Sequence, residues 1–268
     1  MVNPKLSIIT VNYNNLAGLQ KTMESVSAQA FTDFEYIVVD GGSADGSKAY
    51  IEEHAGKLSY WASEKDEGIY HAMNKGIAKA NGEYLLFLNS GDYFYTPESI
   101  SKLFEHSHHE DIIYGILMVN EEDGKQWILD YPSELSFGYF YRHSLPHQST
   151  LINADLFKTI GLYNEKLKIA ADWEFFMKAI CMHNATYKYV NEIITVFSMG
   201  GVSTNPVFTE SSLNERHQIL NSQYGLYINE YLEYLQIKAE LYNYKNSRAH
   251  KLVEKIIQSS LYRKMRKQ

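Results

Sequence analysis

Apolar and polar residues follow one another in blocks along the chain, and the spacing within each block indicates its secondary structure. Short continuous apolar runs predict buried strands at residues 6–11, 34–40 and 84–88. Apolar residues at every third or fourth position predict helices at residues 16–30 and 69–77. Strands that alternate with helices in this order are typical of a sheet covered by helices, as in α/β proteins.

The rest of the chain continues this alternation. Further helices are expected at 47–54, 97–106, 154–160 and from Asp172 onward, and the tail from Leu213 is expected to be helical. Further strands are expected at 58–63, 150–152, 186–189 and 193–198. Thr96 before Pro97 is a plausible N-cap, and Asp123-Gly124 predicts a hairpin turn between strands at 112–119 and 126–129. Residues 199–206 are expected to form a mobile loop.

Polar residues follow the predicted strands at the points where the strands end. The tetrad Asn89-Ser90-Gly91-Asp92 comes directly after the strand at 84–88, which delivers oxygen ligands to the carboxyl edge of the sheet. Open α/β sheets bind ligands at that edge. The sequence therefore predicts a ligand site there.

A nucleotide at this edge would have to be held without a glycine-rich phosphate loop. Neither G-x-G-x-x-G nor G-x-x-x-x-G-K-[ST] occurs in the chain. Asp40, at a strand end, can accept a hydrogen bond from the N–H of a base such as uracil, and Thr10 and Asn12 can contact the base or the ribose. An aspartate before Gly-Gly is equally suited to forming a turn.

Composition bounds the class of protein. With 268 residues, of which 45% are hydrophobic, the chain suits one large domain or a domain with an appendage. No apolar run is long enough to span a bilayer and the N-terminus has no signal-peptide core, so we expect a cytoplasmic protein. The net charge of −7 argues against nucleic-acid partners. The single cysteine, Cys181, lies in an apolar run and is expected to be a buried structural thiol.

The charge is unevenly distributed. Residues 236–268 hold nine Lys and Arg against two Glu, a net +7, so the first 235 residues carry −14. Within residues 249–268, five apolar residues at helical spacing accompany six basic ones, as in helices that lie on anionic membranes. The apolar residues are Leu252, Val253, Ile256, Ile257 and Leu261. We expect peripheral membrane contact through this segment; alternatively, the stripe packs on the catalytic domain or on a second copy in a homodimer.

Seven collinear segments resemble the glycosyltransferases of family 2, in particular the bacterial branch that builds O-antigen, colanic acid or capsule. They are SIITVNYN (7–14), VVDGGS (38–43), DEGIYHAMNKG (66–76), NGEYLLFLNSGD (81–92), PHQ (146–148), ADWE (171–174) and GGVS (200–203). The resemblance implies a GT-A fold, a Rossmann-like mixed sheet flanked by helices. It assigns residues 1–210 to a catalytic domain and leaves 211–268 as a helical, basic extension.

The resemblance also implies a reaction. A hydroxyl of a glycan or lipid-linked acceptor attacks the anomeric carbon of a nucleotide-sugar donor, with a UDP-sugar favoured, and the configuration inverts. The reaction needs a base for the hydroxyl proton and positive charge beside the leaving diphosphate. The residues expected to bind the donor are Thr10, Asn12, Asp40, Asp66, Asn74, Asn89, Ser90 and Gly91.

For the positive charge, the family uses an Asp-X-Asp motif that binds Mg²⁺ or Mn²⁺. This chain departs from the motif, since Asn89 and Gly91 stand where the two aspartates are expected and Asp92 follows one residue later. An amide oxygen can ligate a metal but brings no charge. We expect Asp92 to be the metal ligand; the alternative is that Asp92 only caps the turn.

For the base, the resemblance points to Asp172, at the start of a helix. The alternative is that Asp172 is only the N-cap of that helix, a position that aspartate favours. A helix N-terminus also lowers the pKa of a carboxyl group and so weakens it as a base. His147 is the alternative base, and the acceptor side is expected to comprise His147, Gln148, Trp173 and Glu174.

Two other functions compete with glycosyl transfer. A sugar-nucleotide pyrophosphorylase would need a glycine-rich, basic loop after the first strand, where this chain has the uncharged Asn12-Tyr-Asn-Asn15. A catalytically silent module that binds sugar nucleotides or glycans is suggested by Asn89 and Gly91, which weaken the metal motif.

Overall fold

The computed structural model describes residues 3–105, 109–121, 123–198 and 206–258 of the chain. The chain forms two compact units, Met1–Arg216 and His217–Gln268. The boundary expected from the sequence, after residue 210, and the boundary between these units both fall inside helix α8 (Pro206–Gln223). The loop expected at 199–206 lies almost wholly outside the described residues.

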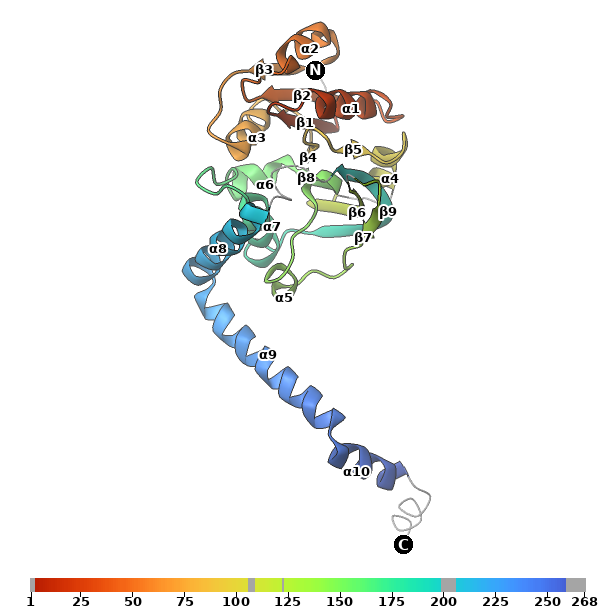
Figure 1. Ribbon diagram of the computed structural model, residues 1–268, viewed down its shortest axis with the longest axis vertical. Coiled ribbons are helices and arrows are strands. Elements are labelled where there is room, and N and C mark those ends of the chain that lie inside the picture. Colours follow the sequence, from red (N-terminus) through yellow and green to blue (C-terminus); the bar gives the residue numbers. More distant parts are fainter. Residues whose placement is uncertain (1–2, 106–108, 122, 199–205, 259–268) are drawn as a thin grey trace. The chain divides into compact units, whose positions relative to one another are not determined.

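The first unit is built on a mixed sheet (Figure 1). Its strands are β1 (Leu6–Asn12), β2 (Phe34–Asp40), β3 (Tyr60–Ser63), β4 (Tyr84–Phe87), β5 (Tyr93–Phe94), β6 (Ile112–Asn120), β7 (Gln126–Leu129), β8 (Thr150–Asn153) and β9 (Tyr187–Ser198). Among the described residues the order is β3-β2-β1-β4-β8-β6-β9-β5, with β7 paired to β6. Strands β3, β2, β1 and β4 are parallel, whereas β8 runs antiparallel to both β4 and β6. The expected fold class is confirmed.

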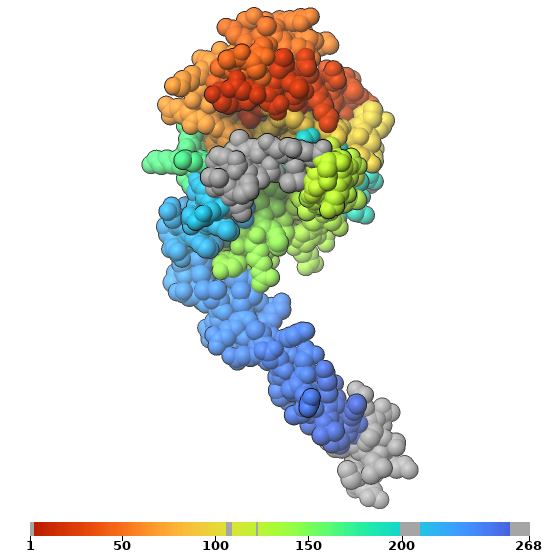
Figure 2. Space-filling view, viewed as in Figure 1, coloured from red at the N-terminus to blue at the C-terminus, as the bar shows by residue number. Residues whose placement is uncertain are grey.

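Helices alternate with the parallel strands as the sequence predicts. The helices of this unit are α1 (Leu16–Ser27), α2 (Ser47–Glu53), α3 (Ile69–Ile77), α4 (Ser99–Glu105), α5 (Phe137–Phe140), α6 (Ala154–Thr159) and α7 (Ala171–Cys181), with 3-10 turns η1 (Ala55–Lys57) and η2 (His147–Ser149). Asn15 caps α1, because its side chain accepts a hydrogen bond from the Gly18 N–H. The space-filling view in Figure 2 shows α1 and α2, coloured red and orange, gathered at one end of this unit.

Two local predictions were wrong. The segments at 186–189 and 193–198 form one strand, β9, which stays paired to β6 across an irregularity near Gly115. A Cβ at Gly115 would lie 2.4 Å from Ile194, so glycine allows the two strands to remain close there. Helix α4 begins at Ser99 rather than at Pro97, since the Thr96 carbonyl accepts a hydrogen bond from the Ser99 N–H in a turn.

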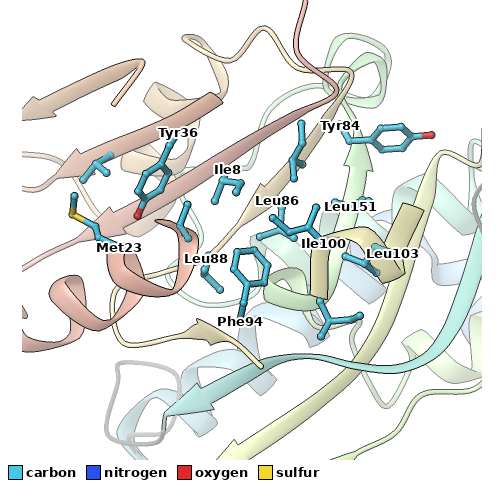
Figure 3. Packing of buried hydrophobic residues seen from close by; sticks show 14 of the residues in the cluster. Ile8, Met23, Tyr36, Tyr84, Leu86, Leu88, Phe94, Ile100, Leu103 and Leu151 are labelled. Atoms are coloured by element: carbon cyan, nitrogen blue, oxygen red, sulfur yellow. The ribbon is translucent and has the colours of Figure 1, made fainter. Parts of the chain in front are cut away.

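The core joins the sheet to the helices that cover one of its faces (Figure 3). Ile8, Leu86 and Leu151 come from the neighbouring strands β1, β4 and β8 and are fully buried, as are Ile100 and Leu103 of α4. Burying one such side chain contributes about 1.5–3 kcal/mol to folding. This packing fixes the ends of β1, β2 and β4 relative to one another, which matters for the residues that follow them.

The second unit is helical. It contains the end of α8 together with α9 (Gly225–Asn246) and α10 (Arg248–Gln258). On α10 the four apolar residues Leu252, Val253, Ile256 and Ile257 are 49–60% exposed. Leu261 and the basic residues beyond it lie outside the described residues. Among the described helices, none has the length and apolar character needed to cross a membrane.

Candidate active site

The carboxyl ends of β1 and β2 bring Asn12 and Asp40 together. The two residues are opposite each other in the parallel register, and the Asn12 amide donates a hydrogen bond to Asp40 Oδ1 at 2.7 Å. The Asn12 Oδ1 atom is buried and has no hydrogen-bond partner among the described residues. A buried acceptor without a donor is costly, so a donor from a bound ligand would be favoured there.

Asp40 itself is already saturated with hydrogen bonds. Besides Asn12, its carboxylate accepts from the Ser43 hydroxyl at 2.5 Å, the Ser43 N–H at 3.0 Å and the Ser63 hydroxyl at 2.7 Å. Burial raises the pKa of Asp40, but these hydrogen bonds outweigh burial and hold the pKa below its usual value. The carboxylate therefore orders the loop after β2, which is the turn-forming role that the sequence left open.

Asp66 lies directly against Gly41. A Cβ at Gly41 would be 2.5 Å from Asp66 Oδ2 and 3.2 Å from the ring of Tyr13, so the missing side chain makes room for both residues. The Tyr13 side chain is 66% exposed. An exposed aromatic ring beside a carboxylate suits a nucleobase, which offers a flat face and N–H donors. Tyr13 lies in the segment 7–14, but nothing in the sequence pattern marks it as a ligand-binding residue.

Thr10 and Asn74 lie in the interior. The Thr10 hydroxyl is fully buried and donates to the Leu88 carbonyl at 2.7 Å. The Asn74 amide donates to the Tyr163 carbonyl at 2.9 Å and accepts from the Tyr163 N–H at 3.1 Å. In this structure both side chains therefore hold protein segments in place, and neither is brought to the surface of the site.

The turn Asn89-Ser90-Gly91-Asp92 is fixed by α1 and β1. The Ser90 N–H donates to the Val11 carbonyl at 3.0 Å, and the Gly91 N–H donates to the Thr22 hydroxyl at 3.0 Å. Gly91 has φ +106°, a left-handed conformation that favours glycine. The sequence Ser-Gly-Asp thus specifies a turn after β4 that an Asp-X-Asp sequence would adopt less easily.

The carboxyl group of Asp92 is buried, with 5% of the residue exposed. The Ser198 N–H donates to Asp92 Oδ1 over a long 3.4 Å. Burial raises the pKa of Asp92 to about 7, and the lowering influence of the nearby His147, the Ser198 N–H and Lys21 does not offset it. A bound cation would compensate a buried carboxylate in this environment.

A chain of polar contacts leads from this turn to Asp172. Asn89 Nδ2 lies 3.2 Å from His147 Nε2, and His147 Nδ1 lies 3.1 Å from Asp172 Oδ2. Because a carboxylate only accepts, Nδ1 carries the proton, and Nε2 accepts from the Asn89 amide. Tyr70 completes the chain: its hydroxyl lies 3.0 Å from Asp172 Oδ1 and 2.5 Å from the Ile169 carbonyl, so these two acceptors share its single hydrogen.

Asp172 is not the N-cap of its helix. Helix α7 begins at Ala171 and its N-cap is Ala170, so Asp172 stands in the first turn, with 17% of its side chain exposed. Burial raises the pKa of this carboxyl, but contacts with His147, the Trp173 N–H and Tyr70 lower it below its usual value. A carboxylate held ionised and oriented by side chains of other elements is suited to accept a proton from a substrate.

The other residues expected on the acceptor side are buried. Trp173 is fully buried and its indole N–H donates to the Phe140 carbonyl at 2.7 Å, while Glu174 is 2% exposed and pairs with Lys178 at 2.7 Å. Gln148, in η2, is 6% exposed. Direct acceptor contacts by Trp173 and Glu174 are thus not available in this structure, and both residues support α7 from inside.

Tyr70 is a second site residue that the sequence pattern does not reveal. It lies within the segment 66–76 and its ring is buried, so periodicity alone marks it as a core residue of α3. The phenol hydroxyl, however, reaches residues about a hundred positions later in the chain. Only the folded chain, which brings the Tyr70 hydroxyl to Asp172 at the start of α7, reveals that contact.

Comparison with known proteins identifies the family of this chain. The model of glycosyl transferase family 2 matches residues 7–166. An uncharacterised glycosyltransferase of Mycobacterium tuberculosis is 38% identical over 186 residues, which cover 66% of this chain and 69% of the relative. A PGL/p-HBAD biosynthesis glycosyltransferase of Mycobacterium bovis is 29% identical over 220 residues, covering 78% of this chain and 83% of the relative.

Solved structures share the fold. Staphylococcus aureus TarS 1–349 in complex with UDP-GlcNAc aligns with a TM-score of 0.59 at 24% identity, over 82% of this chain and 67% of TarS 1–349. The mannosyltransferase PcManGT of Pyrobaculum calidifontis, in complex with GDP-Man and Mn²⁺, aligns with a TM-score of 0.57 at 13% identity, over 98% of this chain and 83% of its own. Together with the family match, these findings show that the chain is a glycosyltransferase that belongs to family 2.

Proposed function

We propose that this protein is an inverting glycosyltransferase that moves a sugar from a UDP-sugar to a hydroxyl group of a glycan or lipid-linked acceptor. The observation that carries the proposal is the chain of contacts from Asn89 through His147 to Asp172. It connects the turn after β4, where a donor diphosphate is expected, to a carboxylate that can take a proton. A module that only bound sugar nucleotides would have no need of that carboxylate.

Asp172 is the proposed base. The acceptor oxygen forms a bond to the anomeric carbon, the bond from that carbon to the diphosphate oxygen breaks, and the leaving diphosphate keeps the electron pair. The hydroxyl proton passes to the Asp172 carboxylate. The low pKa of Asp172 is compatible with this step because the hydroxyl becomes acidic only as its new bond forms. His147 and Tyr70 orient the carboxylate.

The nucleotide is proposed to lie across the ends of β1 and β2. The Tyr13 ring, Asp66 and the Asn12 Oδ1 atom present a flat apolar face and two acceptors at this edge. Asp40 orders the loop around them through Ser43. Uracil has an N–H that such acceptors can bind, and the structural neighbour TarS is seen with UDP-GlcNAc.

Mg²⁺ or Mn²⁺ is proposed as the cofactor. Among the described residues no cluster of three His, Cys, Asp or Glu side chains could hold a metal, but such ions commonly bind through one or two protein oxygens together with substrate phosphates. The buried Asp92 carboxyl fits this role, as does the buried Asn89 Oδ1, which has no hydrogen-bond partner within the described part of the chain. A bound ion would supply positive charge to the leaving diphosphate.

A role in surface polysaccharide or glycolipid synthesis is proposed for the whole chain. One relative is described as a PGL/p-HBAD biosynthesis glycosyltransferase. Helix α10 presents exposed apolar side chains together with Lys251 and Lys255, which suits the anionic cytoplasmic leaflet of a membrane. Contact with that leaflet would bring the enzyme to a lipid-linked acceptor. A homodimer through the same helix is the competing arrangement.

A donor screen tests the proposal. Melting temperatures would be measured with UDP, GDP and dTDP, and with UDP-GlcNAc, UDP-glucose and UDP-galactose, each with and without Mn²⁺. A ligand that binds the folded state raises the melting temperature, and we expect this for UDP and for one UDP-sugar. Slow release of UDP from that sugar would show catalysis, whereas stabilisation without any release, even with acceptors added, would favour the silent binding module.

A further inference from the structure

Glu215, on α8, binds three consecutive backbone N–H groups in the first unit. Its Oε1 accepts from Lys168 at 2.7 Å, and its Oε2 accepts from Ile169 at 3.1 Å and from Ala170 at 3.0 Å. Hydrogen bonds to an ionised carboxylate are about twice as strong as those between neutral groups. One side chain therefore fixes three successive peptide groups in one conformation.

These three peptide groups lead directly into the turn that carries Asp172. Ala170 is the N-cap of α7 and makes no side-chain capping bond, so Glu215 supplies from another helix a restraint that the local sequence lacks. The Ile169 carbonyl accepts the hydrogen bond from Tyr70, the residue that also contacts Asp172. The position of Ile169 thus couples Glu215 to the orientation of Asp172.

The next residue of α8 restrains the same turn from its other side. The Arg216 guanidinium carbon lies 5.1 Å from the ring centre of Trp173, over the ring. Trp173 is in turn held by the Phe140 carbonyl. Adjacent residues of α8 therefore contact the segments immediately before and immediately after Asp172.

We propose that Glu215 is a positioning residue for the catalytic carboxylate: by holding residues 168–170 it keeps Asp172 in contact with both Tyr70 and His147. This inference rests on the proposed function, in which Asp172 takes the acceptor proton. Displacing a catalytic group by as little as 1 Å can cost about 100-fold in rate. A general role in stability would instead affect the amount of folded enzyme and leave the chemistry of the folded enzyme unchanged.

The pH dependence of the reaction separates these two roles. The ionisable groups that influence Asp172 are His147, Tyr70, Tyr163 and Arg216. Contacts with His147 and Tyr70 hold the pKa of Asp172 low. Once residues 168–170 are released, these contacts weaken and that pKa rises. The acid limb of the pH–rate profile then moves to higher pH.

The experiment compares Glu215→Ala, Glu215→Gln and the control Glu233→Gln, which alters an exposed carboxylate on α9. UDP release is measured from the UDP-sugar that the donor screen selects, and UDP affinity by calorimetry. We expect Glu215→Ala to lower kcat about 10- to 100-fold and to move the acid limb of the pH–rate profile to higher pH. UDP affinity should stay unchanged. Glu215→Gln keeps one acceptor oxygen and should fall between Glu215→Ala and wild type. If Glu215→Ala fails to fold, Glu215→Gln alone is compared with wild type.

Two further measurements test the mechanism directly. Amide hydrogen exchange at residues 168–170 should accelerate in Glu215→Ala and stay as in wild type in Glu233→Gln. In a double-mutant cycle, Glu215→Ala should lower kcat little further when Asp172 is already asparagine, because Glu215 acts through Asp172.

The proposal is overturned if Glu215→Gln keeps the wild-type rate, acid limb and exchange, or if kcat and UDP affinity fall together. It is also overturned if the two substitutions lower kcat independently. These outcomes are distinct from failure of the proposed function. If Asp172→Asn releases UDP at the wild-type rate, the base assignment itself is wrong, whatever Glu215 does.

Discussion

His147 and Asp172 are 25 positions apart in the chain, yet the Nδ1 atom of His147 lies 3.1 Å from Oδ2 of Asp172. The contact joins η2, which leads into β8, to the first turn of α7. It assigns the two ring nitrogens different tasks, since Nδ1 donates to the carboxylate and Nε2 faces Asn89. The two candidate bases are therefore partners in one arrangement.

Substitutions at these two residues should have unequal effects. Asp172→Asn is nearly isosteric, and we expect it to lower kcat by about 10²–10⁴, the usual contribution of a positioned base, while UDP affinity stays unchanged. His147→Ala should lower kcat less and shift the acid limb of the pH–rate profile upward, because the His147 contact helps to keep the pKa of Asp172 low. Equal losses of kcat would instead favour His147 as the base, and unfolding of Asp172→Asn would indicate a structural role.

Two substitutions test the proposed nucleotide site at the ends of β1 and β2, and the first of them removes no polar group. Gly41→Ala places a methyl carbon 2.5 Å from Asp66 Oδ2, which is too close, so Asp66 must move. We expect UDP affinity, measured by calorimetry, to fall about 10-fold, in the range of one lost hydrogen bond. Asp40→Ala should weaken UDP binding as well, by releasing the loop at Ser43. Gly56→Ala is a matched control, since a Cβ there meets nothing within 4 Å. Unchanged UDP affinity in both Gly41→Ala and Asp40→Ala would show that the nucleotide binds elsewhere.

Asp92 should give the metal-free protein a measurable pH dependence of stability. Burial raises the pKa of Asp92 to about 7, whereas the pKa of an aspartate in an unfolded chain is about 3.9. Between these values the unfolded chain loses a proton that the folded protein keeps, so the contribution of Asp92 to stability is full below about pH 4 and is lost as the pH rises to about 7.

We therefore expect the free energy of unfolding of the metal-free protein to fall across this window by roughly 4 kcal/mol at most. Asp92→Asn should flatten the curve. Mn²⁺ with UDP should stabilise the wild type at pH 7.5 more than Asp92→Asn. Chemical denaturation at several pH values measures both effects. A wild-type curve that matches the variant, or full activity in excess chelator, would reject Asp92 as the metal ligand.

The C-terminal helix should bind anionic membranes. Removing the residues after Arg248 takes away the exposed apolar side chains of α10 together with Lys251 and Lys255. Each basic residue near an anionic surface contributes about 1 kcal/mol, so we expect sedimentation with phosphatidylserine vesicles to be lost while UDP release continues. Neutral vesicles are the control. A truncated protein that unfolds or changes its oligomeric state would show that the helix packs on protein instead.

The fold class could be predicted from the sequence alone, and the sequence also predicts at which edge of the sheet a ligand would bind. Apolar runs of strand length and apolar stripes of helical period are local signals, and they predicted β1, β2, α3 and β4 closely because each element buries one continuous set of side chains. The position of the polar tetrad 89–92 follows from the same pattern, since it begins where the apolar run ends. Membership of family 2 follows from collinear motifs, which are also properties of the sequence.

The contacts of the polar side chains could not be predicted from the sequence. Thr10, Asn74, Trp173 and Glu174 lie in motif segments, but in the folded chain their side chains are buried and hold other segments in place. Asp172, which the sequence left between an N-cap and a base, is oriented by Tyr70 and His147 from distant parts of the chain. Glu215 gives no sequence signal at all, because its partners are backbone N–H groups more than forty residues earlier. Hydrogen bonds are short and directional, so their partners are chosen only when packing brings distant segments within about 3 Å of each other.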